Sequence, residues 1–523
     1  MYLGPLRLLA AEVYEKLTAG GTYTNLVTGQ EKRDVAFVTH TAATVEMAGT
    51  HDEYDIVVID EIQMIADQQR GFAWTRALLG VRCKEIHVCG GLEAKELVKK
   101  LAQKCGDEFE LREYTRFNEL EIAQEAIADQ PETLGSYKAV RPGDCVVAFS
   151  RADIFAIKRE IEKHTDYKCC VIYGTLPPET RTDQARRFND PDSGYDILVA
   201  SDAIGMGLNL NIRRVIFNTV YKSDGNGIIR LDHSAVKQIA GRAGRRNSQY
   251  PNGEVTCRDP RDLEYIQQCM STEIKPLEKA GLLPTGEHIE VFSAALKTYK
   301  LDKDYDDLAK VLTQFSDMAT VQGDFTLCWQ TSMQAIAKWL HGLDLTISEK
   351  YTLCLAPVPT TSMSGMAMIR NFAKKHAANE VAGLNRSVVP KRPKSFDDMA
   401  NLCSVYSELE LFLWLHGRFP GNVMEQQTAT NLKGLTIDMI NEGLNAAENL
   451  KLDHCYLKRD TRLRRNWASN QNSEGKGYDQ FEGIGDDDDE DDDDDMMDYG
   501  FGDNEAGRVG RTKGKRMKQR SSM

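Results

Sequence analysis

Residues 54–61 read Y-D-I-V-V-I-D-E, and this stretch decides the class of fold. Four consecutive β-branched residues, 56–59, predict a fully buried strand of a parallel sheet. Asp60 and Glu61 then emerge at the carboxyl end of that strand, where open α/β sheets bind their ligands. An aspartate here can hold Mg²⁺ and the next acid can orient a water molecule, although Asp-Glu after a strand is also a common solvated turn.

The segments around this strand predict a first α/β domain over residues 1–138. Residues 4–18 have the apolar spacing of an amphipathic helix, and no strand is expected ahead of it. Short β-prone pieces at 25–29 and 37–47, a helix at 70–79 and a strand at 85–91 complete the domain. Residues 110–138 contain Pro131 and Gly135 without clear periodicity at their end, which is typical of a link between domains.

Alternating strands and helices predict a second α/β domain over residues 139–263. This alternation indicates a parallel sheet with right-handed crossovers. The expected strands are 145–150, 168–174, 196–201 and 214–217, and the expected helices are 152–164 and 178–189.

The remaining chain changes character twice. Residues 264–465 show helical apolar spacing with few strand candidates and predict a helical domain packed against the second α/β domain. Its clearest helices are expected at 306–315, 334–340, 364–376 and 397–415. Residues 466–523 hold an acidic run, 486–495, and a basic end, and this composition predicts disorder because too little apolar surface is available for burial.

Charge and cysteine usage limit the classes of protein. The net charge is −14, and residues 466–523 carry more than half of it, so a basic channel in the body is compatible with the total. Twelve cysteines without a C-x-x-C pair favour free thiols in a reducing compartment over a disulfide framework or a zinc site. No apolar run is long enough to predict a membrane span.

A second motif carries paired arginines. Residues 236–246 read V-K-Q-I-A-G-R-A-G-R-R, and the spacing of Arg242 and Arg245 predicts two guanidiniums on the same side of a helical turn. Gly241 and Gly244 leave room for a phosphate to approach. The alternative is the beginning of a surface helix with two solvated arginines. Together with the acidic pair on the first domain, the arginines predict a nucleotide site at the domain interface.

The ordered series of motifs resembles the superfamily-two helicases. D-E-I-Q (60–63) is similar to their motif II, A-S-D-A-I-G-M-G-L-N-L (200–210) to motif V, and Q-I-A-G-R-A-G-R (238–245) to motif VI. G-P-L-R-L-L-A (4–10) resembles motif Ia, V-T-G-Q-E-K-R (27–33) motif Ib, T-A-A-T-V-E-M (41–47) the element after it, V-C-G-G (88–91) motif III and V-A-F-S-R (147–151) motif IV. Over residues 1–450 the chain resembles the suppressor-of-var type, the RNA helicases of the mitochondrial degradosome.

This resemblance implies two RecA-like domains, the first incomplete, followed by a helical domain. It also implies roles for individual residues. The residues implied in catalysis are Asp60, Glu61, Gln63, Gln238, Arg242 and Arg245, with Asp60 as the Mg²⁺ ligand. The residues implied near the nucleotide are Asp202, Gly205 and Gly241. The residues implied at the nucleic-acid backbone are Pro5, Arg7, Thr28, Gly29, Thr44, Ser150, Arg151 and Ser201. For the hydroxyl residues among these, caps and turns at strand ends remain the alternative.

The implied function is an ATP- and Mg²⁺-dependent RNA helicase that works with a 3′-exoribonuclease in RNA degradation. The resemblance places it in the mitochondrial matrix, with the nucleus as the alternative. The sequence contains no G-x-x-x-x-G-K-[ST], so we expect a helicase truncated before motif Ia. An ATPase-deficient adaptor that binds RNA or an exonuclease, and a DNA translocase, stay open as alternatives. The acidic run is either a solvated spacer or a competitor of RNA for basic residues.

Overall fold

The computed structural model describes residues 1–114, 120–128, 137–223, 227–245, 249–299, 306–321, 323–328, 331–359, 362–385 and 388–445. These residues belong to one unit, Met1–Asn470, and the second unit, Gln471–Met523, falls outside them. The predicted disorder of residues 466–523 therefore concerns residues outside the described part of the chain.

The first sheet has six strands in the order β3-β2-β4-β1-β5-β6, and every neighbouring pair except β2 and β3 is parallel. The strands are β1 (Tyr2–Gly4), β2 (Thr24–Val27), β3 (Lys32–Arg33), β4 (His40–Thr44), β5 (Glu53–Ile59) and β6 (Arg82–Val88). The expectation that no strand precedes the first helix is wrong, because β1 pairs with both β4 and β5. A strand of three residues is too short to give a periodic signal.

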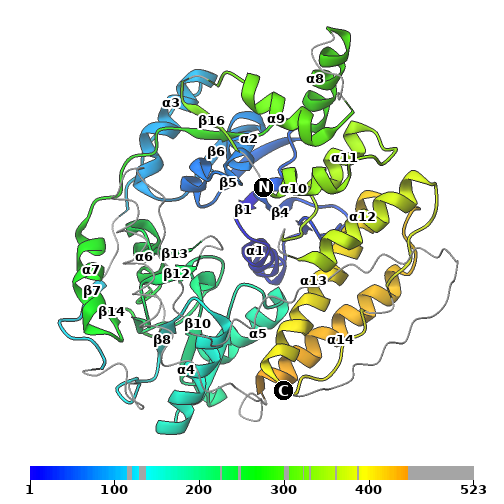
Figure 1. Ribbon diagram of the computed structural model, residues 1–523. Helices are drawn as coiled ribbons and strands as arrows, with labels where there is room; N and C mark the ends of the chain where they lie inside the picture. The colour runs from blue at the N-terminus through cyan, green and yellow to red at the C-terminus, as the bar shows by residue number, and fades with distance from the viewer. Residues whose placement is uncertain are drawn as a thin grey trace, which may run out of the picture. The chain divides into compact units, whose positions relative to one another are not determined.

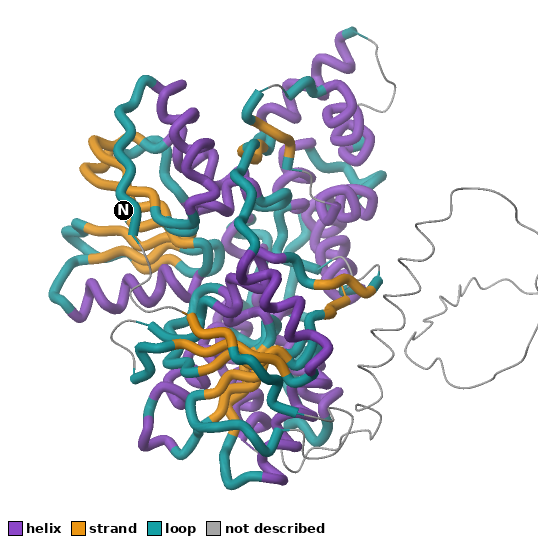
Figure 2. Tube along the Cα trace, turned by 90° about the vertical axis from the view of Figure 1, so that its left-hand side faces the viewer, coloured by secondary structure: helices purple, strands orange, loops and turns teal. Residues whose placement is uncertain are grey.

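Helices lie on both faces of this sheet, as Figures 1 and 2 show. They are α1 (Arg7–Ala19), α2 (Gly71–Gly80) and α3 (Lys95–Cys105). Trp74 of α2 and Leu97 and Leu101 of α3 are fully buried in the core of this domain. Short 3-10 helices connect other elements of both α/β domains: η1 (Val45–Met47), η2 (Ile62–Ala66), η3 (Leu92–Ala94), η4 (Pro191–Ser193) and η5 (Asp202–Gly205).

Strand β5 is parallel to its neighbours, as predicted, but it is not buried on both faces. Val57 and Ile59 are completely buried in the core with α2 and α3, whereas Ile56 is 48% exposed on the opposite face. Helix α1 packs on β1, β2 and β4, so the face of β5 that carries Ile56 stays open. The hydrophobic run identified the strand, but it could not show how far the covering helix reaches.

The second sheet is entirely parallel, with the order β7-β14-β11-β8-β10-β9. Its strands are β7 (Leu120–Ile122), β8 (Asp144–Val147), β9 (Cys169–Ile172), β10 (Ile197–Ala200), β11 (Arg214–Phe217) and β14 (Gly253–Cys257). Strand β7 comes from the segment expected to be only a link, so that part of the prediction is wrong. The accompanying helices are α4 (Arg151–His164), α5 (Pro178–Asn189), α6 (His233–Ala240) and α7 (Pro260–Ser271), with an antiparallel pair β12 (Tyr221–Ser223) and β13 (Ile228–Arg230).

A helical region follows, as predicted. It contains α8 (Gly286–Thr298), α9 (Leu308–Met318), α10 (Thr331–Trp339), α11 (Ile347–Cys354), α12 (Met363–Ala377), α13 (Phe396–Arg418) and α14 (Gln426–Asn445). Met399 and Leu402 of α13 and Ile440 of α14 share a core with Ile154 of α4, so the expected packing against the second α/β domain is confirmed. The parallel pair β15 (Ala280–Leu282) and β16 (Phe325–Leu327) instead packs on the first domain through Ala280.

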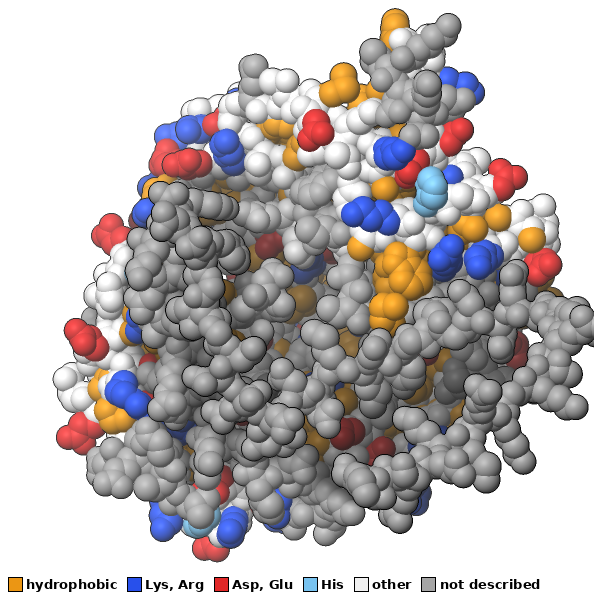
Figure 3. All heavy atoms as spheres, viewed as in Figure 1, with side chains coloured by type: hydrophobic (Ala, Val, Ile, Leu, Met, Phe, Trp, Pro, Cys, Tyr) orange, Lys and Arg blue, Asp and Glu red, His pale blue; other side chains and the backbone are white. Residues whose placement is uncertain are grey.

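Charged side chains, cysteines and the lengths of apolar helices can be compared with what the sequence predicts. Among the side chains coloured in Figure 3, basic and acidic groups are interspersed around the margin of this face. Within the described ranges all cysteines are free and most are buried. No helix in the described part of the chain is both long and apolar enough to cross a membrane.

Candidate functional site

The predicted acidic pair lies at the carboxyl end of β5. The Asp60 carboxylate accepts hydrogen bonds from the Tyr2 hydroxyl at 2.8 Å and from the Glu61 backbone N–H at 2.9 Å. Burial and the neighbouring aspartate raise the pKa of Tyr2, so its hydroxyl stays protonated and continues to donate. The indole of Trp74 holds the carbonyl oxygen of Asp60 at 2.9 Å. Asp60 is therefore fixed at the edge of the first sheet.

Glu61 is oriented by an unusual backbone conformation. Its φ and ψ of 51° and 50° lie in the left-handed region, which few residues other than glycine adopt. The Gln63 amide donates to the Glu61 carboxylate at 2.5 Å, and its oxygen accepts from the Gly91 N–H at 3.0 Å. A Cβ at Gly90 would lie 2.3 Å from that oxygen, so the turn after β6 needs glycine there. Gln63 thus ties the catalytic candidate Glu61 to the next strand.

The paired arginines do not lie on a helical turn. Helix α6 ends at Ala240, so Arg242 and Arg245 follow its carboxyl end, and both the predicted helical arrangement and the alternative of a helix beginning are wrong. Gly241 is the C-cap of α6. Further along, Gly244 has a φ of +63°, and a Cβ there would lie 2.2 Å from the backbone of Gly253, so glycine is required at this close approach.

Arg242 reaches the acidic pair from the second domain. Its Nη2 lies 4.0 Å from Glu61 Oε1 and donates a hydrogen bond to the Gly205 carbonyl. Burial, reinforced by the charge of Arg245 and opposed by Glu61 and Asp60, lowers the pKa of Arg242 to about 10. The guanidinium thus remains charged at neutral pH. A cation from one sheet and a carboxylate from the other face each other, as the sequence predicted.

The other residues predicted near the nucleotide lie in the loop after β10 or beside it. The Arg245 guanidinium donates to Asn209 at 3.0 Å, so both arginines hold this loop. A Cβ on Gly205 would lie 3.7 Å from the Gln238 side chain, which places Gln238 beside Arg242 and its partner carbonyl. Asp202 begins η5, half-exposed, with Lys222 3.7 Å away. Gly241 caps the end of α6, next to Arg242.

The same loop touches the first domain. Gly207 has a φ of +81°, and a Cβ at this position would lie 2.7 Å from Leu6 Cδ1 in the segment between β1 and α1. Glycine is therefore required both by the backbone and by the neighbour. The contact joins the stretches that resemble motifs V and Ia.

The nucleic-acid candidates lie at strand ends. On the first sheet the candidates follow β2, β4 and β1, which are adjacent and parallel, so their carboxyl ends meet at one edge. These candidates are Pro5, Arg7, Thr28, Gly29 and Thr44. On the second sheet Ser150 and Arg151 follow β8, and Ser201 follows its neighbour β10. The structure thus brings each group together.

Local hydrogen bonds involve several of these residues. The Thr28 hydroxyl closes a turn with Glu31, Ser150 caps α4 and Ser201 caps η5. Thr44 is buried and makes no cap. Caps at strand ends were the alternative interpretation, and for three of the hydroxyls the geometry is that of a cap or turn. Arg7 is held by Glu410 of α13, 2.7 Å away, a partner that the sequence did not indicate.

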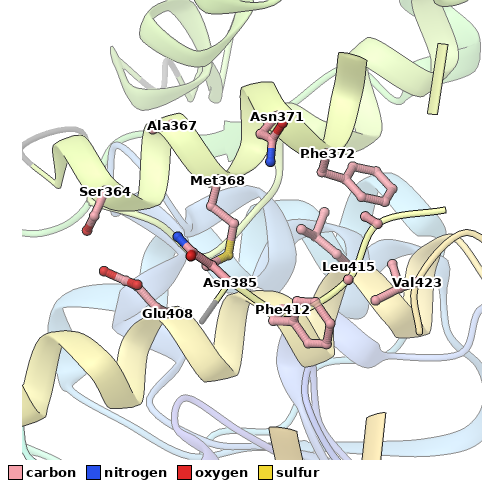
Figure 4. Close-up of a pocket in the computed structure, with 12 residues that line it drawn as sticks. Ser364, Ala367, Met368, Asn371, Phe372, Asn385, Glu408, Phe412, Leu415 and Val423 are labelled. Carbon is pink, nitrogen blue, oxygen red and sulfur yellow. The ribbon is translucent and has the colours of Figure 1, made fainter. Parts of the chain in front are cut away.

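One cavity of about 300 Å³ lies in the helical region, between α12, α13 and residues 382–385. Figure 4 shows its apolar lining, with Phe372, Phe412 and Leu415, and the polar side chains of Asn371 and Glu408. None of its lining residues belongs to the predicted motifs. No pattern in the sequence indicates this cavity.

Matches to known protein families show to which family this chain belongs. Residues 1–114 match the DEXQ-box helicase domain of Suv3, and residues 129–247 match the helicase conserved C-terminal domain. Residues 335–377 match Suv3 C-terminal domain 1, and residues 399–446 match the C-terminal domain of the ATP-dependent RNA helicase SUV3. The mitochondrial ATP-dependent RNA helicase SUV3 of Oryza sativa subsp. japonica is 37% identical over 477 residues, which cover 90% of this chain and 80% of the relative. The chain belongs to the Suv3 family of helicases.

Other relatives of this Suv3 chain are longer. The mitochondrial DExH-box ATP-dependent RNA helicase DExH18 of Arabidopsis thaliana is 40% identical over 448 residues, or 86% of this chain and 56% of the relative. The human mitochondrial ATP-dependent RNA helicase SUPV3L1 is 37% identical over 473 residues, or 87% of this chain and 58% of the relative. The chain thus spans little more than half the length of these two proteins. The crystal structure of Escherichia coli DEAH/RHA helicase HrpB is a distant neighbour, 14% identical with a TM-score of 0.45, covering 83% of this chain and 57% of that chain.

Family membership confirms the predicted fold class of the Suv3 chain: two RecA-like α/β domains and a helical region. Two contacts at its site were missed from the sequence. Tyr2 was missed because β1 was not expected, although its register opposite Val58 brings it next to Asp60. Glu410, on α13, was recognised as a helical residue but given no role. Its ion pair with Arg7 depends on packing between domains, which local patterns do not contain.

Proposed function

We propose that this chain is an ATP-dependent RNA helicase, in which ATP drives movement of the two RecA-like domains along RNA. The observation that carries the proposal is the approach of Arg242 from one domain to Glu61 on the other, 4.0 Å away. Such a pair can act only while the domains are closed. Nucleotide chemistry and domain movement are therefore coupled through one contact.

The residues at this contact fit the roles that ATP hydrolysis needs. Glu61, positioned by Gln63, can orient the attacking water, and Arg242 can balance the charge that develops on the γ-phosphate. Asp60 offers hard carboxylate oxygens at the sheet edge, and each oxygen that accepts one hydrogen bond keeps further lone pairs, so Mg²⁺ fits this position. When bound, Mg²⁺ would neutralise phosphate charge.

RNA binding is supported by the arrangement of the strand-end candidates. Hydroxyl groups, backbone N–H groups and Arg7 and Arg151 lie at the carboxyl edges of the two sheets, and such groups suit phosphate oxygens. Contacts of this kind carry little information about bases, so we propose binding that is independent of sequence.

RNA-stimulated ATP hydrolysis tests the proposal. It is measured on this chain and on the longest product of its reading frame, because residues 1–523 hold no Walker A motif to cradle the phosphates. Where that motif is present, we expect Glu61→Gln to reduce hydrolysis by about 100-fold or more. Glu53→Gln, at the exposed start of β5, is the matched control and should have no effect. RNA binding without turnover in both products would instead favour the adaptor.

Partners and location extend the proposal. Because relatives are named as mitochondrial RNA helicases, we propose a role in RNA degradation in the mitochondrial matrix, with a 3′-exoribonuclease as partner. Fractionation of the endogenous protein, followed by isolation of its complexes, tests both points. An unlabelled DNA competitor as effective as RNA of equal length would favour a DNA translocase, because preference for the 2′-hydroxyl identifies RNA.

A further inference from the structure

The cavity between α12, α13 and residues 382–385 has the composition of a binding site. Its volume of about 300 Å³ is at the lower end of the range for ligand pockets. Phe372 of α12 and Phe412 and Leu415 of α13 contribute to its apolar walls. Glu408 is the only ionisable group among the described residues that line it, and in Figure 4 its carboxylate lies at one end of the cavity with the Phe372 ring at the other. A matching ligand therefore combines an apolar body with a group that pairs with a carboxylate.

The aromatic wall of the cavity is held in place by its neighbours. The Phe372 ring stacks on His376 with the ring centroids 5.7 Å apart and an interplanar angle of 10°, and it packs against Phe419 at 5.1 Å. His376 Nε2 in turn lies 3.0 Å from Glu349 Oε1 on α11. Because these contacts fix the ring, the cavity exists before a ligand arrives, and less ordering is needed on binding.

Exposed apolar side chains continue the lining onto the surface. Met363 is 62% exposed, Met424 60% and Val381 39%, and each is the neighbour in sequence of a lining residue. Apolar groups that gather in this way around a pocket are typical of sites that bind another protein. Methionine suits such a surface because its flexible thioether adapts to the shape of a partner. The apolar surface is thus wider than the cavity, which favours a peptide over a small molecule.

The charges beside the cavity are negative. Glu408 is half-buried and makes no ion pair or hydrogen bond within the described residues. The Glu425 carboxylate accepts from the Leu384 N–H at 2.8 Å, and a Cβ on the lining residue Gly383 would lie 3.1 Å from it. Glu425 has a φ of +70°, a strained conformation of the kind found at ligand sites. These carboxylates favour a cation on the partner and disfavour a phosphate backbone.

We propose that this cavity binds a peptide segment of a partner protein, in which a large apolar residue stands next to Arg or Lys. The apolar side chain fills the space between Phe372 and Phe412, and the neighbouring cation pairs with Glu408. The flanking residues of the peptide cover Met363 and Met424. Such an anchor in a preformed pocket carries most of the affinity of a contact of this kind, and the charge at its edge gives specificity. The site is independent of the proposed ATP and RNA chemistry.

Selection of random dodecapeptides displayed on phage tests the proposal, with the full chain as target. Ala367→Trp, used for counter-selection, fills the cavity from an exposed position on α12, so the fold should be kept. We expect the selected peptides to share a large apolar residue beside Arg or Lys. By fluorescence anisotropy, a labelled peptide of this kind should bind Ala367→Trp about tenfold more weakly, because its anchor loses the pocket. Ala378→Trp, exposed at the end of the same helix and outside the cavity, is the matched control and should bind like the unmodified chain.

Glu408 provides a second test, which does not depend on filling the cavity. Glu408→Gln keeps the shape of the side chain and should weaken the same peptide about tenfold, as for loss of a charged hydrogen bond. Glu408→Lys should instead prefer a peptide in which Glu replaces the Arg or Lys. This exchange of preference is a readout that a loss of folding cannot produce. Equal binding of the original peptide by all three chains would overturn the role of the carboxylate and with it the proposal.

Three further outcomes would also overturn the proposal. Selection of no peptide, or of peptides without the apolar and basic pair, would exclude this class of partner. Selected peptides that bind Ala367→Trp as tightly as the unmodified chain would place their site elsewhere. Weaker binding of a labelled oligo(U) by Ala367→Trp, with no peptide selected, would assign the cavity to RNA.

Discussion

Arg242 shows how one residue combines burial with charge. Its side chain is 14% exposed, and burial lowers its pKa to about 10, below the value it has in the unfolded chain. Because the folded-state pKa of this cation is depressed, its charge opposes folding at neutral pH, and the penalty diminishes only as pH rises from about 10 towards the pKa of the unfolded chain. The protein therefore retains a destabilising charge beside Glu61, which is expected of a functional residue.

The first prediction concerns the buried charge of Arg242. Where a Walker A motif is present, Arg242→Gln should reduce RNA-stimulated ATP hydrolysis by about 1,000-fold, the range seen when an arginine that stabilises phosphoryl transfer is lost. Its melting temperature should stay the same or rise, because the desolvation penalty is removed. Arg159→Gln, exposed on α4, serves as the control for a general charge effect. A marked fall in melting temperature would mean that Arg242 holds the fold together instead.

A second prediction concerns Gly207. Gly207→Ala forces a side chain into a left-handed backbone conformation and against Leu6, so we expect a loss of about 1–3 kcal/mol in the free energy of unfolding. Chemical denaturation measures it. Gly174→Ala, with open space around its Cβ and no positive φ, should change stability little. Adding Leu6→Ala to Gly207→Ala should recover only the part due to the steric clash.

Helix α13 carries the element-scale prediction. The buried carboxylate of Glu410 forms ion pairs with Arg7 and Lys433. Glu408, two residues away, lines the cavity beside α12. Removing one charge of a buried pair leaves its partners uncompensated, so Glu410→Gln should lower the free energy of unfolding by about 2–4 kcal/mol. Glu408→Gln should cost much less in the same denaturation assay. Equal losses would show that Glu410 contributes no more than a surface charge.

At the scale of elements, the sequence predicted what local patterns encode. The helices 178–189 and 397–415 and the strand 214–217 were found because their periodicity or apolar runs are long and bounded by clear signals. Strands β1 and β7 were missed because each has three residues and is fixed by pairing with distant strands. The end of α6 was misplaced because Gly241, its C-cap, was interpreted only as space for a phosphate. The approach of Arg242 to Glu61 was predicted from the pairing of an acidic motif on one domain with an arginine motif on the next, because the two together fit a nucleotide site.

The whole molecule combines a net charge of −14 with a proposed polyanionic partner. Acidic and basic side chains are interspersed at the margin of the face in Figure 3, so attraction of RNA must come from local groups such as Arg7 and Arg151. The acidic run 486–495 opposes this attraction at long range, wherever it lies. Its effect must then depend on salt, because screening shortens the reach of unpaired charges.

The last prediction follows from that dependence. Replacing the acidic residues of 486–495 by asparagine and glutamine keeps the length of the chain and removes ten negative charges. We expect RNA affinity, measured by fluorescence anisotropy with a labelled single-stranded oligo(U), to rise severalfold at about 0.05 M salt, and the gain to shrink towards 0.3 M as the Debye length falls from about 14 to about 6 Å. A gain that does not change with salt would contradict this prediction, because both a solvated spacer and a competitor of RNA for basic residues act through charges that salt screens.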